Sequence, residues 1–270
     1  MYEEFYGFSE PPFNITPDPR FLFFSDRHRE AFDHLVFGIT ERKGFIQITG
    51  EVGAGKTTLC RALFDHLDEG YETALILNPR MTSLQLLRSI LAELGIETDG
   101  DDRFLYLEAL NRFLLDQVAQ GQDVVLVIDE AQDMSIELLE EVRLLSNLET
   151  DQRKLLQIVL MGQPELRELL DDRRLRQLRQ RITVRYHLSP LTLHETEHYI
   201  GHRMKLAGGN GRPTIDRWAL RKIYRYSRGV PRLINAVCDK ALLCGFVDGA
   251  DRLRRGHIKR AIRELEGRIT

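Results

Sequence analysis

Short apolar runs alternate along most of the chain with longer stretches in which apolar residues recur every three or four positions. The short runs predict buried strands, and the longer periodic stretches predict helices with one apolar face. The strands are expected at 45–49, 73–77, 123–128, 155–161 and 183–188. The helices before and between them are expected at 25–42, 56–67, 83–94, 104–120, 136–148, 164–170 and 175–180. This alternation predicts an α/β fold class with a five-stranded parallel sheet that helices cover on both faces.

The two ends of the chain follow other patterns. The first 20 residues are rich in proline and aromatic residues, which argues against regular helix there and predicts an ordered arm. From Thr192 onward the strand pattern stops, and helices are expected at 194–206, 215–227, 230–244 and 255–265. We therefore expect three parts: 1–44, an N-terminal arm and first helix packed on the core; 45–189, the α/β domain; and 190–270, a small all-helical domain.

Composition adds a charge asymmetry to this picture. The 270 residues carry a net charge of −3, but the residues from Pro190 onward carry +9 and those before it carry −12. A basic part of this kind suits an anionic partner, although the plainer interpretation is that it faces the acidic body of its own or a neighbouring chain. No apolar run is long enough to span a bilayer, and the acidic N-terminus lacks an export segment, so we expect a cytoplasmic protein.

The segment between the first expected strand and the helix after it carries the pattern GxxxxGKT. Its glycines allow backbone N–H groups to turn inward around an anion, and the following helix adds the positive end of its dipole. In this pattern the Lys56 amine reaches the β- and γ-phosphates, and the Thr57 hydroxyl binds Mg²⁺. The plainer alternative, a turn without a ligand, is disfavoured by the strand and helix on either side. The expected phosphate-binding residues are Gly50, Glu51, Val52, Gly53, Ala54, Gly55, Lys56, Thr57 and Thr58.

Polar side chains follow the third and fourth expected strands. Asp129 and Glu130 end the third strand in the arrangement called Walker B, in which Asp129 supports Mg²⁺ and Glu130 polarises the attacking water. Gln163 follows the fourth strand, where it can hold that water or sense the γ-phosphate. The alternatives are acids that end a strand at the surface and a polar residue that starts a turn before Pro164.

Arginines in two regions are candidates for stabilising charge on the γ-phosphate. Arg179 and Arg181 end a basic series before the fifth strand, and an arginine finger from a neighbouring subunit can act in this way. Arg232 follows Pro231 in the first turn of a helix, from which it can report hydrolysis by moving the helical domain. The alternative for each is an ordinary solvent-exposed arginine.

These motifs, in this order and followed by a helical domain, resemble the AAA+ ATPases. In that resemblance Gln163 takes the sensor 1 position, where Asn or Thr is more usual, Arg232 takes the sensor 2 position and Arg181 the finger position. A narrower resemblance covers nearly the whole chain, to the ExeA/GspA group of general secretion pathway ATPases and the related MshM-like and exopolysaccharide-locus ATPases. It rests on Tyr6-Gly7-Phe8, Thr16-Pro17-Asp18-Pro19-Arg20, the segment 44–51, Asp129-Glu130-Ala131-Gln132 and Gly162-Gln163-Pro164-Glu165-Leu166.

The resemblance implies an ATPase that uses ATP and Mg²⁺ and works as a homo-oligomer, a ring or a dimer, with nucleotide at the subunit interfaces. It implies adenine contacts from Ile15, Thr16 and Pro17 of the arm. Long members of the group continue into a membrane span and a wall-binding domain, and they assemble the secretin with a GspB-type partner. The chain is then expected at the inner face of the bacterial inner membrane, as the ATPase part of a longer protein, or it is a short member of the pilus type.

Two other functions stay open at this point. The +9 C-terminal part leaves room for a DNA-linked AAA+ ATPase that resembles the transposition helper proteins. A nucleotide switch or scaffold that does not hydrolyse ATP is the third, and Glu130 argues against it because the catalytic carboxylate is present.

Overall fold

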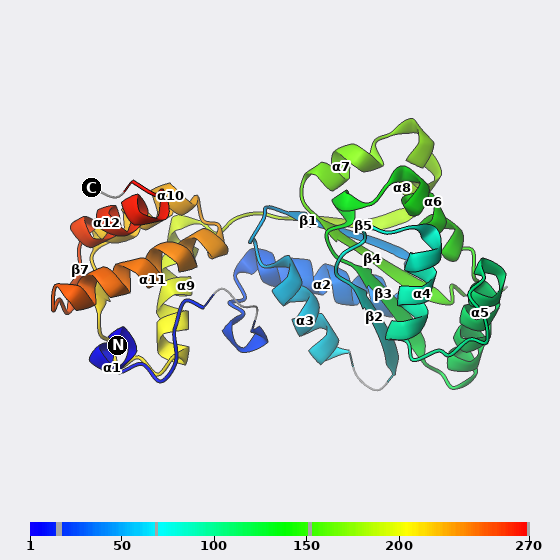
Figure 1. The fold of residues 1–270 in the computed structure, drawn as a ribbon, viewed down its shortest axis with the longest axis horizontal. Helices are drawn as coiled ribbons and strands as arrows, with labels where there is room; N and C mark the ends of the chain where they lie inside the picture. Colours follow the sequence, from blue (N-terminus) through cyan, green and yellow to red (C-terminus); the bar gives the residue numbers. More distant parts are fainter. Residues whose placement is uncertain (15–17, 68–69, 151–152, 269–270) are drawn as a thin grey trace. The chain divides into compact units, whose positions relative to one another are not determined.

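The computed structural model describes residues 1–14, 18–67, 70–150 and 153–268, and Figure 1 shows its fold. By packing, the chain divides into two compact units. The α/β unit comprises Arg27–Gly50 and Leu59–Leu188. The helical unit comprises Met1–Asp26, Glu51–Thr58 and Ser189–Thr270. Each unit has a hydrophobic core of its own.

The α/β unit is built on a sheet of five parallel strands in the order β2-β3-β4-β1-β5. The strands are β1 (Phe45–Gly50), β2 (Tyr71–Ile76), β3 (Asp123–Ile128), β4 (Leu156–Gly162) and β5 (Ile182–Leu188). Three of them, β1, β3 and β4, are buried at every position, as their continuous apolar sequences predict. The predicted five-stranded parallel sheet is therefore confirmed, and the carboxyl ends of its strands lie at one edge.

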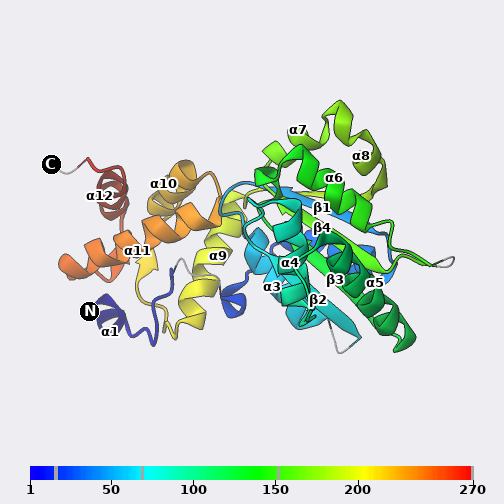
Figure 2. The same ribbon diagram turned by 45° about the vertical axis from the view of Figure 1, so that its right-hand side comes forward.

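Helices cover both faces of this sheet, as Figures 1 and 2 show from two directions. They are α2 (Asp26–Thr40), α3 (Lys56–His66), α4 (Ser83–Glu93), α5 (Arg103–Ala119), α6 (Ile136–Leu145), α7 (Glu165–Leu170) and α8 (Arg176–Arg181). On one face, α4, α5 and α6 bury leucines against alternate residues of β3 and β4. On the other face, Gly38 of α2 lies against Ile46 of β1. Cover on both sides is the reason that the central strands are apolar throughout.

The helical unit packs four long helices around a second core. They are α9 (Leu193–Leu206), α10 (Arg217–Ser227), α11 (Pro231–Val247) and α12 (Arg255–Leu265). Polar side chains define where they begin: Thr192 and Glu195 form a capping box at α9, and the Asp216 carboxylate accepts from two backbone N–H groups at α10. Pro231 occupies the first turn of α11, where its missing N–H costs nothing.

The N-terminal arm belongs to the helical unit, which corrects the expectation that it packs on the α/β core. Tyr6, Phe8 and Phe13 are buried in the same core as α9, α10, α11 and α12. The Tyr6 hydroxyl donates to the backbone carbonyl of Ala250 at 3.0 Å. The physical reason is that a small helical domain buries a low fraction of its surface alone, and the aromatic arm enlarges its core.

Two further features differ from the sequence prediction. The arm begins with a short helix, α1 (Tyr2–Tyr6), which forms because the first proline, Pro11, comes after it. The helical unit also contains two-residue parallel strands, β6 (Thr214–Ile215) and β7 (Arg252–Leu253), which are too short for a periodic pattern to indicate. Among the described residues, every helix is too short or too polar to cross a membrane.

Candidate functional site

The phosphate-binding loop follows β1 and leads into α3. Lys56 is buried to 5% exposure, and its Nζ donates to the Glu51 carbonyl at 3.2 Å. Two glycines have backbone angles that other residues rarely adopt, Gly53 with φ 76° and Gly55 with φ 101°. These angles turn the loop back on itself ahead of the α3 N-terminus, as an anion-binding loop requires.

Arg232 contacts this loop from the first turn of α11. Its backbone N–H donates to the Gly53 carbonyl at 3.2 Å. The approach is so close that a Cβ on Gly53 would lie 2.3 Å from the Cβ of Arg232. The candidate sensor arginine and the loop thus form one packed cluster within the helical unit.

Asp129 and Glu130 directly follow the carboxyl end of β3. Asp129 is 3% exposed, and its carboxylate accepts from the Glu130 backbone N–H at 2.8 Å. Glu130 has φ 51°, in the left-handed region that residues other than glycine rarely adopt.

Burial, with the nearby Asp129 charge, raises the pKa of the Cys60 thiol to about 12, so this cysteine is an inert core residue.

A network of two amides holds the Glu130 carboxylate. The Gln132 side-chain nitrogen donates to one Glu130 oxygen at 2.9 Å, and the Gln163 side-chain nitrogen donates to the same oxygen at 3.2 Å. The Gln132 carbonyl oxygen accepts from the Gln163 backbone N–H at 2.9 Å. Gly162 leaves room for this arrangement, because a Cβ there would lie 2.8 Å from the same Gln132 oxygen. The Gln132 side chain thus links the residues that follow β3 and β4.

Gln132 is a candidate functional residue that the sequence reasoning missed. It lies in the Asp129-Glu130-Ala131-Gln132 segment of the resemblance, but the sequence predicts no role for it. The available signal was an amide two residues after a catalytic acid, in the turn that follows a parallel strand. An amide can donate and accept at once, so at that place it can bridge an acid on one strand to the backbone of the next.

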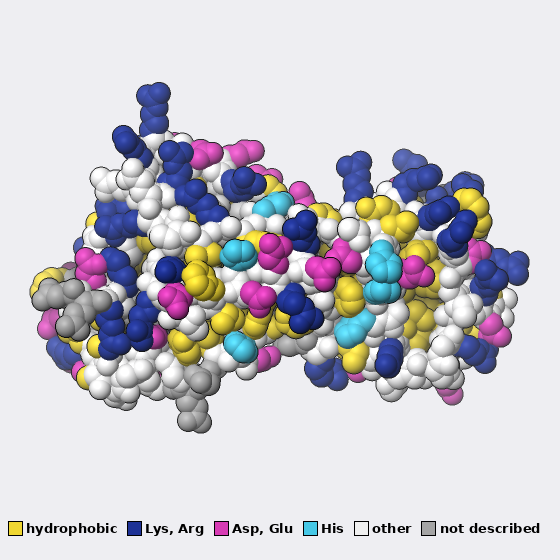
Figure 3. Space-filling view, turned by 180° about the vertical axis from the view of Figure 1, so that it is seen from behind, with side chains coloured by type: hydrophobic (Ala, Val, Ile, Leu, Met, Phe, Trp, Pro, Cys, Tyr) yellow, Lys and Arg dark blue, Asp and Glu magenta, His cyan; other side chains and the backbone are white. Residues whose placement is uncertain are grey.

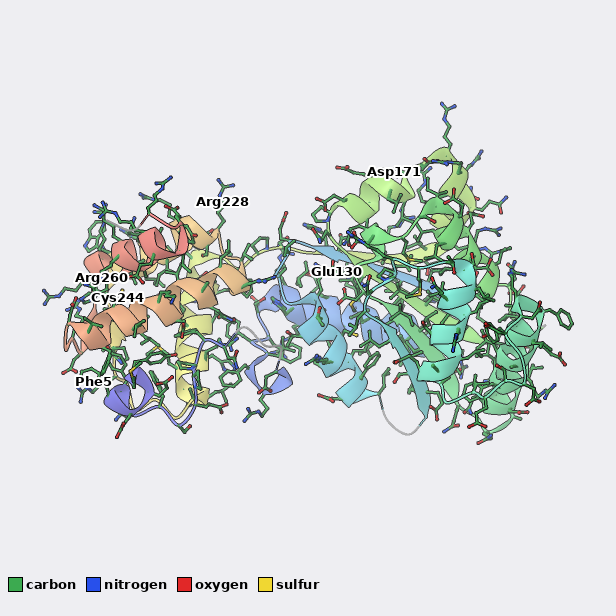
Figure 4. All side chains as sticks on the ribbon, viewed as in Figure 1. Phe5, Glu130, Asp171, Arg228, Cys244 and Arg260 are labelled. Carbon is green, nitrogen blue, oxygen red and sulfur yellow. The ribbon has the colours of Figure 1, made fainter. Side chains whose placement is uncertain are left out.

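The expected residues of the α/β unit meet at one edge of its sheet. Gly50 ends β1, Asp129 and Glu130 follow β3, and Gln163 follows β4, and these strands run in one direction. Figure 4 labels Glu130 at this edge. The phosphate-binding loop begins from the same edge, because Glu51 is covalently joined to Gly50. The parallel sheet thus accounts for acids and amides collecting where the loop starts.

The candidate finger arginines have partners within their own chain. The Arg181 guanidinium donates to the Ser146 hydroxyl at 2.5 Å and to the Arg143 carbonyl at 3.3 Å, near the end of α6. Arg179 forms an ion pair of 2.9 Å with Asp171, which Figure 4 labels. The same basic series also contains Arg173 and Arg176, which are exposed and have no ion pair in the described part of the chain.

Two other expectations concern the arm and metal ions. Ile15, Thr16 and Pro17, the expected adenine contacts, lie outside the described residues. The described residues contain no cluster of three or more His, Cys, Asp or Glu side chains suited to a metal ion. Thr57 and Asp129, the expected Mg²⁺ ligands, are a hydroxyl and a carboxylate, and oxygen ligands are the type that Mg²⁺ takes beside nucleotide phosphates.

Comparison with known proteins places this site in context. Residues 39–170 match the family model described as an AAA domain. The chain is 45% identical over 268 residues to general secretion pathway protein A of Aeromonas hydrophila. That alignment covers 99% of this chain and 49% of the relative, so the chain spans about half the length of the curated protein it matches.

Solved structures share the fold at lower identity. Cdc6p of Pyrobaculum aerophilum superposes with a TM-score of 0.71 at 16% identity, over 97% of this chain and 70% of that chain. Drosophila ORC bound to DNA gives 0.71 at 17%, over 94% and 64%. The RuvB Holliday junction branch migration motor of Thermotoga maritima gives 0.58 at 18%, over 90% and 69%. At these identities the likeness establishes the fold alone, a P-loop fold of the AAA+ type.

Proposed function

We propose that this chain, an AAA+ protein that resembles the ExeA/GspA group along its length, binds ATP with Mg²⁺ and hydrolyses it. Lys56 contacts the β- and γ-phosphates, and the loop N–H groups surround them. Thr57 and Asp129 hold the Mg²⁺, which neutralises charge that develops on the phosphates. Glu130 polarises the attacking water, and Gln163 orients that water or detects the γ-phosphate.

The observation that carries this proposal is the position of the Glu130 carboxylate. Two side-chain amides hold one of its oxygens, at 2.9 and 3.2 Å, at the sheet edge from which the phosphate-binding loop begins. An acid that only ends a strand at the surface would not need two amides to orient its carboxylate. Its left-handed backbone, with φ 51°, is the kind of local strain that concentrates at active sites.

The test separates binding from turnover with two variants. Glu130→Gln keeps the shape of the side chain but loses its charge, so we expect ATP affinity to be retained and turnover to fall by about 10²- to 10⁴-fold. Lys56→Ala removes the phosphate contact, so we expect binding itself to be lost. Affinity is measured with a fluorescent ATP analogue, turnover by phosphate release, and Glu165→Gln on the exposed start of α7 is the matched control.

Chelation of Mg²⁺ supplies a further arm of the same test. Turnover should stop with excess chelator and return when Mg²⁺ is added back. Phosphate release at the normal rate by purified Glu130→Gln would overturn the assigned role of this carboxylate. An unchanged rate of ATP turnover in excess chelator would show that hydrolysis does not require Mg²⁺.

We further propose that hydrolysis is coupled to protein assembly at the bacterial envelope. The support is the 45% identity to a protein whose name assigns it to the general secretion pathway. A cytoplasmic chain at the inner face of the inner membrane, a GspB-type partner and a secretin are the corresponding expectations. In this view Arg232 reports the state of the nucleotide through α11, and subunits of a homo-oligomer exchange arginines such as Arg181 or Arg179. Co-purification of the chain with candidate inner-membrane partners, in ATP and in ADP, tests this assignment.

A further inference from the structure

The C-terminal half of the helical unit repeats one strand-and-helix motif. β6 leads into α10, β7 leads into α12, and the two strands pair in parallel with Ile215 opposite Leu253. Each helix begins two residues after its paired position, at Arg217 and Arg255. The two helices contact each other, and both bury their apolar faces in the same core. Their opposite faces therefore point away from that core in the same way.

Each helix carries a row of cations on that outer face. The rows occupy positions i, i+4 and i+8, which lie on one side of a helix over about 12 Å. The cations of the two rows are Arg217, Arg221 and Arg225 on α10, and Arg255, Lys259 and Arg263 on α12. All six are exposed, and Figure 3 shows Lys and Arg side chains gathered over this part of the helical unit.

These rows lack counter-charges within the described helical unit. None of the six forms an ion pair there, whereas Arg212, Arg260 and Arg268 outside the rows each pair with a carboxylate. No acidic residue lies within α10, and α12 contains only Glu264. Unpaired cations at this density repel one another, and a bound polyanion relieves this repulsion while its own condensed counterions are released.

An exposed tryptophan adjoins the rows. Trp218 is 58% exposed, and the Arg217 and Arg221 guanidinium carbons lie 5.9 and 5.3 Å from its ring centroid. An aromatic side chain among arginines offers an apolar surface for a backbone sugar beside contacts for phosphates. The same arginines surround the indole with charge, which makes its insertion into hydrocarbon unfavourable.

We propose that the outer faces of α10 and α12 form a binding surface for the phosphate backbone of duplex nucleic acid. Arginine dominates the two rows, and its planar fork bonds phosphate oxygens in pairs. The rows fit a rigid array of closely spaced phosphates, because their own spacing is fixed by the helices. Contacts to phosphates carry no sequence information directly, so recognition is of backbone rather than sequence.

A membrane surface is the less suitable occupant. Amphipathic helices that lie on bilayers bury their apolar face among lipids. In α10 and α12 that face is already used, since Leu220, Ile223, Ile258 and Ile262 are buried in the protein core. The two rows would then hold lipid headgroups by charge alone. The phosphates of a fluid bilayer are also less regularly spaced than those of a duplex.

The proposal is tested with the whole chain and a fluorescein-labelled duplex of about 20 base pairs, by anisotropy between about 50 and 200 mM salt. We expect a dissociation constant in the range of about 1 to 100 μM at the higher salt, typical of binding to backbone. Arg217→Gln/Arg221→Gln/Arg225→Gln should weaken binding at least about tenfold and lower the slope of log affinity against log salt by about 2 to 3. The same three changes in the α12 row should have a similar effect.

A matched control removes three exposed cations elsewhere. Arg29, Arg88 and Arg167 of the α/β unit are exposed and have no ion pair in the described part of the chain. Changing all three to Gln should leave the affinity for the duplex within about twofold. This control and the row variants lose the same net charge, so they differ only in where the charge is removed. Circular dichroism and ATP turnover of every variant establish that the fold and the proposed catalytic site are unaffected.

Four outcomes would overturn the proposal. The first two are absence of duplex binding at physiological salt and an equal loss of binding in the control variant. The third is tighter binding of the chain to phosphatidylglycerol vesicles, from which the duplex cannot displace it. The fourth is that the row variants change only the self-association of the chain. The proposal does not depend on ATP hydrolysis, so failure of either leaves the other standing.

Discussion

Gln132 is the single residue on which the geometry around Glu130 depends most. It donates to the Glu130 carboxylate at 2.9 Å and accepts from the Gln163 backbone at 2.9 Å. Gln132→Leu keeps the size of the side chain and removes both bonds. We expect turnover to fall by about 10- to 100-fold while ATP affinity is unchanged, because the carboxylate loses its orientation and not its charge. Parallel measurement of phosphate release and of nucleotide affinity checks this split.

Gln132→Glu refines the same prediction. It retains an oxygen that accepts from the Gln163 N–H but replaces the donor to Glu130 with a second acceptor. Turnover should therefore fall as in Gln132→Leu, although the link to β4 is kept. Gln177→Leu on the exposed side of α8 is the control for surface changes. Equal losses of affinity and turnover would mean that Gln132 supports the fold rather than the position of Glu130.

Gly53 makes the contact between the loop and α11 possible. Gly53→Ala introduces a Cβ at a φ of 76° and 2.3 Å from the Arg232 Cβ, so the backbone strain and the clash act together. The strain alone costs about 1–2 kcal/mol, and the clash should displace Arg232 and weaken ATP binding by more than tenfold. Gly121→Ala has a similar φ of 80° with no atom within 4 Å, so it isolates the strain. A normal ATP affinity in Gly53→Ala would show that the loop tolerates separation from Arg232.

At the scale of elements, one buried arginine ties the N-terminal arm to α9. Arg203 is 6% exposed and forms no ion pair with a carboxylate among the described residues. Its guanidinium instead donates to the carbonyls of Pro12 at 2.6 Å and Asn14 at 3.2 Å and to the Tyr199 hydroxyl at 3.0 Å, and it lies 4.7 Å from the Phe21 ring centroid. Each bond to such a charged group contributes about 1.5–3 kcal/mol. The segment that leads into the expected adenine contacts is thus fixed by α9.

Arg203→Met should release this arm. The apolar side chain fills the space but leaves the two carbonyls without the guanidinium, so we expect the free energy of unfolding to fall by about 3 kcal/mol. Urea unfolding and the rate of chymotrypsin cleavage near Phe13 measure the effect. Lys205→Met, on an exposed position of the same helix, should change neither. Cleavage as slow as in the unchanged chain would mean that the buried aromatic residues alone hold the arm.

Periodicity predicted the elements well where they are long and buried. β3 at 123–128 has its predicted bounds, and the bounds of most helices differ by one to three residues. The pattern failed where the determining contact is distant in sequence. The aromatic residues of the arm are as compatible with one core as with another, and only the fold shows that Tyr6 and Phe13 complete the helical unit. The β6–β7 pair is too short to carry any period.

The candidate site divides in the same way. Spacing alone predicted that Lys56 follows the first strand and that Asp129 and Glu130 follow the third, and the structure has them there. Their roles toward phosphate, Mg²⁺ and water stay predictions. The bridging role of Gln132 and the internal bonds of Arg181 were not predicted, because each depends on a hydrogen-bond partner more than 30 residues away. Hydrogen-bond partners of that kind follow from packing, which a single sequence does not encode locally.

At the scale of the whole molecule, we expect a second copy of the chain to complete the site. A trans arginine requires an interface that brings it to the nucleotide of a neighbour, either head-to-tail in a ring or reciprocally across a two-fold axis in a dimer. In a mixture of Arg181→Ala and Lys56→Ala chains, each type of chain lacks one part. If Arg181 acts in trans, an Arg181→Ala chain with an intact loop meets an intact Arg181 of its neighbour at about one quarter of the interfaces under random mixing. We therefore expect about a quarter of the original turnover to return.

Arg181 donates to Ser146 in its own chain, so a structural role must be separated from a role in trans. Ser146→Ala removes that bond and leaves the arginine, so it should reduce turnover little if Arg181 acts on a neighbouring nucleotide. The same mixing test with Arg176→Ala in place of Arg181→Ala examines an exposed arginine of the series. If turnover returns in the mixture with Arg176→Ala but not in that with Arg181→Ala, Arg176, the first residue of α8, is the arginine that acts in trans. Arg181 would then stabilise the contact between α8 and α6. No recovery with either, in assemblies whose formation is verified by light scattering, would exclude both as fingers in trans.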